Sequence, residues 1–238
     1  MAAFLYISVR PERAAADAEY ASFRRGLGVD ALDRLDLLAT ALDADTIAAY
    51  HGIVVGGSPF NVTDPAPTDT QQRVEADLER LASAAIAQST AALFTCYGIG
   101  VVTRMLGGTV TNDHPESASA AVIRTTAAGR QDPLFGPSGD ELAVFTAHKE
   151  SAAATPPGAD LLAIGEACPV QAYRVGTHLY ATQFHPEPSP QDFADRMTFY
   201  RTKGYFDPNR FDHVQRQVLA AAVTEGEALL ARFADRFA

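Results

Sequence analysis

The chain has 238 residues, of which 47% are hydrophobic and 20% are charged, and its formal net charge is −10 at pH 7. That size can bury a full core, so we expect one domain over residues 1–238. The acidic balance argues against a nucleic-acid partner, and no apolar run reaches the ~20 residues of a membrane span. With no signal-peptide pattern and only two cysteines, the sequence indicates a cytoplasmic protein.

The first half of the chain alternates predicted strands and helices. Residues 4–9 are rich in β-branched and aromatic side chains and predict a strand, and a helix over 14–25 is expected to stop at Gly26. This alternation predicts right-handed crossovers and a parallel sheet. The further elements expected here are a weak strand at 31–38, helical turns at 45–50, a strand at 52–55, a helix from 69 and a strand at 91–95.

The second half begins with a helix to about Leu106 and then changes to short strands separated by Gly, Pro and Asp, which predicts a mixed sheet. Ser189 and Pro190 predict a helix start and Gly204 its end, and one last helix is expected from Asp207 onward. The short strands are expected at residues 109–111, 121–125, 142–146, 161–164, 170–175 and 179–184.

The stretch Ala-Ala-Leu-Phe-Thr-Cys-Tyr-Gly at residues 91–98 is the first candidate site. A short apolar run predicts a buried strand that leads into Cys96, and Gly98 permits a sharp turn into a helix. Such a turn exposes a nucleophile at the strand's end, and a helix N-terminus with a nearby imidazolium favours a thiolate. The alternative is a buried structural cysteine.

The segment Gln-Phe-His-Pro-Glu at residues 183–187 is the second candidate. His185 could take the thiol proton and return it to a leaving amine, and Glu187 could orient the imidazole. The backbone N–H groups of Gly57 and Tyr97 could stabilise an oxyanion. The alternatives are a plain turn at Gly57 and a capped helix start at His185. A metal site is disfavoured because no partner stands at metal-ligand spacing.

Three segments together make this chain resemble the class I, triad-type glutamine amidotransferases, and within them the glutaminase domain of GMP synthase. They are Gly-Gly-Ser-Pro at 56–59, Thr-Cys-Tyr-Gly at 95–98 and the segment at 183–187. The resemblance covers about residues 50–190, with C-terminal helices over 189–237. It implies a flavodoxin-like α/β fold with a mixed, mostly parallel central sheet flanked by helices.

The resemblance also implies a reaction that needs no cofactor. Cys96 would attack the side-chain amide of glutamine, release ammonia and form a γ-glutamyl thioester that water hydrolyses, with His185 and Glu187 completing the triad. In such proteins the residues matching Gly57 and Tyr97 form the oxyanion hole. Those matching Gly56, Gly100, Ala147 and His148 lie at the substrate.

Two departures from the family pattern affect substrate and partner. Gly100 stands where the family usually has a glutamine that holds the amino-acid end of the substrate. No synthetase domain follows in this sequence, so a separate synthetase subunit is the expected ammonia acceptor, with a homo-oligomer left open. Two alternatives remain: a γ-glutamyl hydrolase or peptidase that uses the same thioester, and a degenerate binding or regulatory module without activity.

Overall fold

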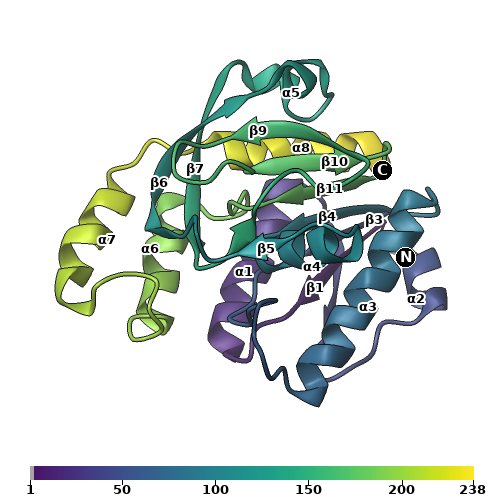
Figure 1. Ribbon diagram of the computed structural model, residues 1–238, viewed down its shortest axis with the longest axis horizontal. Coiled ribbons are helices and arrows are strands. Elements are labelled where there is room, and N and C mark those ends of the chain that lie inside the picture. Colours follow the sequence, from purple (N-terminus) through teal and green to yellow (C-terminus); the bar gives the residue numbers. More distant parts are fainter. Residues whose placement is uncertain (1–2) are drawn as a thin grey trace.

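One mixed sheet organises the molecule (Figure 1). The computed structural model describes residues 3–238. Neighbouring strands pair in parallel from β2 to β11 and antiparallel from β11 to β7. From edge to edge the strands are β2 (Leu32–Asp36), β1 (Phe4–Ser8), β3 (Gly52–Val55), β4 (Ala91–Thr95), β11 (Leu179–Thr182), β10 (Ala172–Val175), β9 (Ala159–Ile164), β6 (Glu116–Thr125) and β7 (Glu141–His148).

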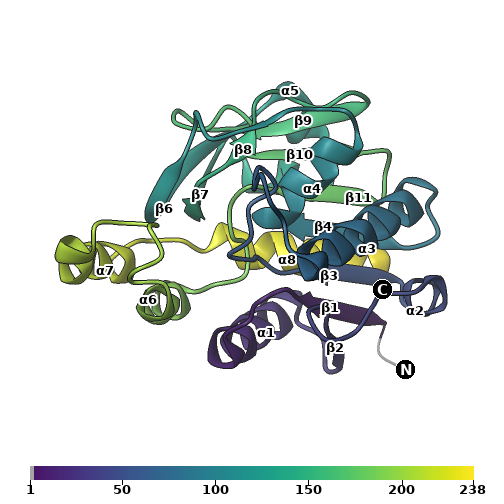
Figure 2. The same cartoon turned by 60° about the horizontal axis from the view of Figure 1, so that its bottom comes forward.

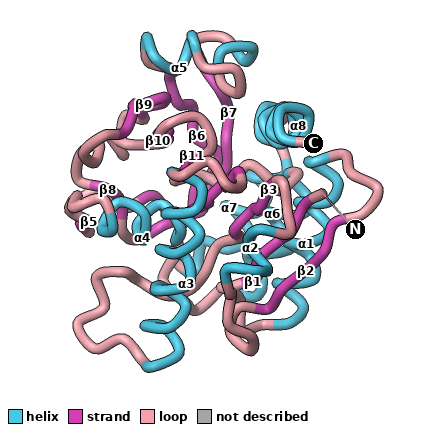
Figure 3. The backbone as a smooth tube through the Cα atoms, turned by 90° about the vertical axis from the view of Figure 1, so that its right-hand side faces the viewer, coloured by secondary structure: helices cyan, strands magenta, loops and turns pink. Residues whose placement is uncertain are grey.

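The parallel strands β1, β3 and β4 are buried along their whole length, which explains their continuous apolar sequence. On one face, Phe4 and Val54 pack with Phe23 and Phe233 of α1 (Arg13–Leu27) and α8 (Glu225–Phe237). The opposite face packs against α2 (Ala44–Ala48), α3 (Asp69–Ile86) and α4 (Tyr97–Met105). Figures 2 and 3 show these two helical layers on either side of the sheet.

A third apolar cluster lies beyond β6 and β7. Here α6 (Pro190–Phe199) and α7 (Phe211–Leu219) pack Phe193 and Phe211 with Ala118 and Phe145 of the sheet. Figure 1 shows both helices at the left end of the sheet, away from α3 and α4. The remaining elements are α5 (Ala127–Gln131), the two-stranded pair β5 (Val110–Thr111) and β8 (Ser151–Ala152), and the 3-10 turns at Gly136–Ser138 and Pro208–Arg210.

The structure confirms the predicted α/β fold and corrects several boundaries. The single helix expected from Asp207 is two helices, α7 and α8, because Val218 belongs to the third cluster and Leu229 to the core under the sheet. The helix expected to end at Gly204 ends at Phe199. Helix α1 continues past Gly26, whose hydrogen lets it pack on α8, and ends at Leu27, where Gly28 caps it with φ 65°. None of the described helices is long and apolar enough to span a membrane.

Candidate active site

Cys96 occupies a sharp turn between β4 and α4. Its φ of 51° and ψ of −100° are a strained combination for a residue with a side chain, which costs about 1–3 kcal/mol and is typical of functional sites. The neighbouring strands hold the turn: Cys96 N donates to Thr182 O at 2.8 Å, and Thr95 Oγ1 donates to Val55 O at 2.8 Å. A Cβ at Gly98 would lie 2.9 Å from Phe94 Cβ, so only glycine permits this close turn.

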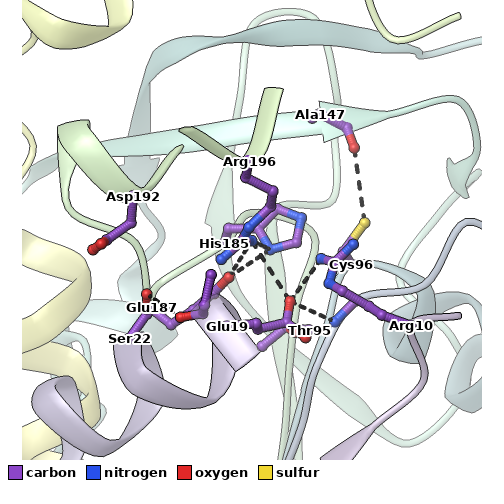
Figure 4. Close-up of polar contacts among 12 residues, drawn as sticks. Arg10, Glu19, Ser22, Thr95, Cys96, Ala147, His185, Glu187, Asp192 and Arg196 are labelled. Atoms are coloured by element: carbon purple, nitrogen blue, oxygen red, sulfur yellow. Dashed lines mark hydrogen bonds and ion pairs between the residues drawn. The ribbon is translucent and has the colours of Figure 1, made fainter. Parts of the chain in front are cut away.

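Four parallel strands deliver Cys96 and three other site residues to the same edge of the sheet. Arg10 follows β1, Gly57 follows β3, Cys96 follows β4 and His185 follows β11. The carboxyl ends of parallel strands form the usual ligand crevice of α/β proteins. Figure 4 shows the Cys96 sulfur, the His185 ring and Arg10 converging there.

His185 is fixed at both backbone and ring. Its N–H donates to Phe145 O at 2.9 Å, and its Nδ1 lies 3.0 Å from Glu187 Oε1. Burial lowers the pKa of His185, but the charges of Glu187 and Cys96 outweigh burial and raise it to about 9. Burial raises the pKa of Glu187, and the opposing charges of His185 and Arg196 bring it well below its usual range. The geometry therefore favours an imidazolium paired with a carboxylate.

Three further charged residues extend this pair into what we call the buried ion-pair chain, His185–Glu187–Arg196–Glu19–Arg10. Arg196 Nη1 lies 2.5 Å from Glu187 Oε1 and 3.5 Å from Glu19 Oε1. Glu19 Oε1 also accepts from Arg10 Nη2 at 2.6 Å. Figure 4 shows Arg196, Glu187 and Glu19 grouped around the His185 ring.

Sequence reasoning missed the three outer members of this chain, although each carried a signal. Glu19 and Arg196 are charged residues on the buried faces of α1 and α6, where they interrupt an apolar pattern. Arg10 lies within a few residues of the end of the first strand, as the site residues of the other strands do.

In a profile of kcat/KM against pH, one limb reflects the titration of His185, whose pKa is about 9. We expect Arg196→Met to move this limb to higher pH. Loss of the guanidinium removes a positive charge beside Glu187, so the imidazolium form of His185 becomes more favourable and its pKa rises further. The measurement is kcat/KM against pH for the folded variant. Arg196→Lys is the control, because it keeps the charge. Identical profiles for the Met variant and the wild type would contradict any influence of Arg196 on the triad.

The two predicted oxyanion donors differ in the structure. Tyr97 is the first residue of α4, so its N–H lies outside the helical hydrogen-bond ladder. Its hydroxyl is anchored away from the thiol by a 2.7 Å bond to Glu75 Oε1. Gly57 N, in contrast, donates to Glu19 Oε1 at 3.3 Å. In this arrangement Tyr97 presents the free donor, and Gly57 instead joins the loop to the buried ion-pair chain.

The residues predicted to bind substrate lie in different environments. Gly56 faces Glu19 rather than the thiol, since a Cβ there would lie 2.2 Å from Glu19 Oε2. Ala147 reaches the nucleophile: its carbonyl oxygen accepts from Cys96 Sγ at 3.9 Å. The His148 ring is engaged by neighbours, with Nε2 2.8 Å from Glu116 Oε2 and Nδ1 3.1 Å from the carbonyl of Glu150.

Gly100, which was predicted to lie at the substrate, faces Val62 beyond the turn. A Cβ at Gly100 would lie 3.1 Å from Val62 Cγ2, so Val62 fills the place of a longer side chain. Glu150 holds Val62 there by accepting from Val62 N at 2.6 Å and from Thr63 N at 3.0 Å. Glu150 is thus a fourth residue that sequence reasoning missed.

We expect Gly100→Gln to destabilise the fold by about 1–3 kcal/mol, because the side chain would overpack the site and displace Val62 from Glu150. Gly100→Ala is the control and should destabilise the fold less, since a methyl group requires Val62 to move by only a few tenths of an ångström. The check is the midpoint of urea unfolding for both variants. A Gln variant as stable as the wild type would mean that Val62 moves aside freely.

Cys96 lies where two pockets meet, and Ser58, Ala147 and Tyr205 line both of them. The His185-side pocket has a volume of about 40 Å³. The Tyr97-side pocket has a volume of about 20 Å³. The first is further lined by Arg10, Ala118, His185, Phe193, Arg196, Met197, Tyr200 and Phe206, and the second by Phe60, Asn61, Tyr97, His148, Lys149, Glu150 and Gln183.

Two groups of described side chains bring possible metal ligands within 4.8 Å of one another. One consists of members of the buried ion-pair chain, where two guanidinium groups already balance the carboxylates. The other is Glu116, His148 and Cys168, but Glu116 Oε2 also accepts from Gln171 Nε2 at 2.6 Å. Burial raises the pKa of Cys168 to about 11, so its sulfur is held as a thiol. Both groups are explained by hydrogen bonding within the protein.

Comparison with known proteins gives relatives consistent with this geometry. The chain is 30% identical over 135 residues to the GMP synthase [glutamine-hydrolyzing] of Pyrobaculum aerophilum, which covers 57% of this chain and 24% of that protein. It is 27% identical over 155 residues to gamma-glutamyl peptidase 3 of Arabidopsis thaliana, which covers 61% of this chain and 57% of that protein. The chain therefore spans about a quarter of the GMP synthase and over half of the peptidase.

A crystal structure of a glutamine amido transferase from Methylobacillus flagellatus has the same fold. It superposes with a TM-score of 0.72 at 19% identity and covers 99% of this chain and 94% of that one. The family described as glutamine amidotransferase class-I matches residues 29–203, which include every residue of the proposed triad. The chain belongs to the glutamine amidotransferase class-I family.

Proposed function

We propose that this protein hydrolyses the side-chain amide of glutamine or of a γ-glutamyl compound through a thioester on Cys96. One observation carries the proposal: a cysteine held at positive φ, at the N-terminus of α4, shares a pocket with a histidine whose Nδ1 contacts a buried carboxylate. This is the arrangement of an activated nucleophile, its base and the group that orients the base.

The residues divide the reaction as follows. His185 takes the Cys96 proton, and the sulfur attacks the amide carbon. The oxyanion forms near the Tyr97 N–H at the start of α4, where the helix dipole favours negative charge. His185 then returns the proton to the leaving nitrogen, which departs as an amine or as ammonia. Water, deprotonated by His185, hydrolyses the thioester to a free carboxylate and regenerates the thiol.

The relatives and the chemistry support a proposal for the partner and the location. The likeness to GMP synthase supports glutamine as the donor and a separate synthetase subunit as the ammonia acceptor. The likeness to gamma-glutamyl peptidase 3 supports the alternative that a larger amine leaves. We place the protein in the cytoplasm, because both cysteines are free and the mechanism needs a reduced thiol.

Trapping the intermediate tests this proposal. The purified chain is mixed with glutamine, quenched in acid and digested, and the Cys96 peptide is analysed by mass spectrometry while glutamate release is followed. The expected result is a glutamyl adduct on Cys96 that disappears as glutamate accumulates. Glutamate release with no adduct, and no inactivation by a thiol reagent, would contradict the covalent mechanism.

A further inference from the structure

The Tyr97-side pocket is placed to hold the acyl chain of the substrate. His185 must deliver a proton to the departing nitrogen, so the leaving group lies on the His185 side of Cys96. The acyl chain then extends to the other side, into the Tyr97-side pocket. The volume of that pocket, about 20 Å³, is little more than the 10–15 Å³, roughly, that one water molecule occupies. The far end of a glutamyl chain therefore lies at the mouth of this pocket.

Lys149 stands at this mouth. Lys149 and Asn61 line the Tyr97-side pocket and also an open outer hollow with a volume of about 510 Å³, so the two spaces adjoin at these residues. The Lys149 ammonium lies 5.0 Å from the centroid of the Tyr205 ring, and Tyr205 lines both pockets at Cys96. An aromatic wall of the nucleophile's pocket thus holds the cation in place.

The charge of Lys149 has no carboxylate partner close by. None of the ion pairs within residues 3–238 includes Lys149. The next residue, Glu150, uses both carboxylate oxygens to accept from the backbone N–H groups of Val62 and Thr63. Lys149 is therefore a cation at the pocket mouth that is available to an anionic group of a ligand.

The other cations of the site lie on the leaving-group side. Arg10 and Arg196 line the His185-side pocket, and both pair with buried Glu19. Arg10 Nε, Arg196 Nε and Arg196 Nη2 are buried and have no hydrogen-bond partner among the described residues, so these guanidinium groups keep unused donors. An acyl chain that extends away from His185 carries its charged end toward Lys149 and away from those donors.

We propose that Lys149 binds the α-carboxylate of the γ-glutamyl group and so selects amino-acid amides over plain amides. This inference rests on the proposed function and names a specificity-determining residue for it. In a γ-glutamyl group, three carbons separate the α-carboxylate from the reacting carbonyl carbon, so one end can lie at Cys96 while the other reaches the mouth. Glutamine and γ-glutamyl peptides share this end, so Lys149 serves either leaving group. A hydrogen bond between an ammonium and a carboxylate is about twice as strong as a neutral one.

The test compares glutamine with 4-aminobutanamide, which is glutamine without its α-carboxylate, and follows ammonia release by the purified chain. A hydrogen bond to a charged group changes binding by about 10–100-fold. We therefore expect kcat/KM for glutamine to exceed that for 4-aminobutanamide by about 10–100-fold, mainly through KM, because the contact is the same before and during the reaction.

Variants of the two lysines then locate the effect. Lys149→Met keeps an unbranched side chain against Tyr205 but removes the charge. It should abolish most of the preference by raising KM for glutamine, with a much smaller change for 4-aminobutanamide. Lys149→Arg keeps the charge and should restore part of the preference. Lys203→Met is the matched control, because Lys203 is exposed and its loss changes the net charge equally.

A binding measurement gives a readout that needs no turnover. In the Cys96→Ala background, calorimetry compares glutamate with 4-aminobutanoate, which again lacks only the α-carboxylate. Addition of Lys149→Met should weaken glutamate binding by about 10–100-fold and affect 4-aminobutanoate much less.

The outcomes separate the two levels of the proposal. An equal loss for both members of each pair would overturn the inference, because Lys149 would then only support the Tyr205 ring. An unchanged preference in Lys149→Met would also overturn it and would direct attention to the free guanidinium nitrogens of Arg10 and Arg196. Failure of every amide to release ammonia or to acylate Cys96 would overturn the proposed function, and glutamate binding would still decide the role of Lys149.

Discussion

Cys96→Ala is expected to lower the rate of amide hydrolysis by at least about 10³-fold, because removal of the nucleophile leaves only binding and oxyanion stabilisation. The substitution removes only the sulfur atom from a site shared by two pockets, so folding and substrate binding should persist. The measurement is glutamate release in single turnover, with unfolding followed in parallel. Activity within tenfold of the wild type would exclude Cys96 as the nucleophile.

Cys168→Ala is the matched control for this experiment. Cys168 is fully buried, its sulfur lies 3.4 Å from the carbonyl oxygen of Val170, and burial raises its pKa to about 11. A thiol in that state is a poor nucleophile. The variant should keep the hydrolytic rate and lose only some stability, from a small cavity in the core. A large loss of rate in this variant would show that the two cysteines act together.

Gly57→Val is expected to reduce kcat/KM by about 100-fold, because a displacement of about 1 Å in a catalytic group can cost that much. A Cβ at Gly57 would lie 2.8 Å from His185 Cε1 and 2.8 Å from Arg10 Nη2. Two contacts this short require the imidazole or the guanidinium to move, and both belong to the buried ion-pair chain. The loss should appear mainly in kcat, since the Tyr97-side pocket lies on the other side of Cys96.

Tyr97→Phe provides the comparison for Gly57→Val. It removes a hydroxyl bonded to Glu75 and keeps the backbone N–H at the start of α4. A milder effect, within about tenfold, is expected if the backbone and not the side chain stabilises the oxyanion. If Tyr97→Phe proved more damaging than Gly57→Val, the hydroxyl and not the glycine loop would support the site.

The sequence predicted the part of the site that depends on strand ends. Apolar runs before Gly57, Cys96 and His185 identify strands, and the parallel order that follows from alternating helices places their ends together. Membership of the family was predicted from the same segments and is confirmed. The roles of the individual residues stay predictions until they are measured.

The parts that the sequence did not predict depend on packing between distant segments. Glu19 and Arg196 come from helices separated by most of the chain, and no local pattern says that they meet. The role of Val62 at Gly100 depends on where Glu150 holds a loop 88 residues away in sequence. The division of the last predicted helix into α7 and α8 was missed for the same reason. One apolar pattern contributes side chains to two different clusters.

The buried ion-pair chain has a consequence for how protons move at this site. Its two guanidinium groups and two carboxylates sum to zero when the imidazole of His185 is neutral. Transfer of the thiol proton to His185 creates one positive and one negative group in contact, so the total stays zero. Uptake of a proton from solvent would instead leave an excess charge in a region shielded from water, which is costly. Electroneutrality thus favours proton transfer within the site over exchange with bulk water. A proton can therefore move between the thiol and the imidazole while a bound substrate closes the pocket.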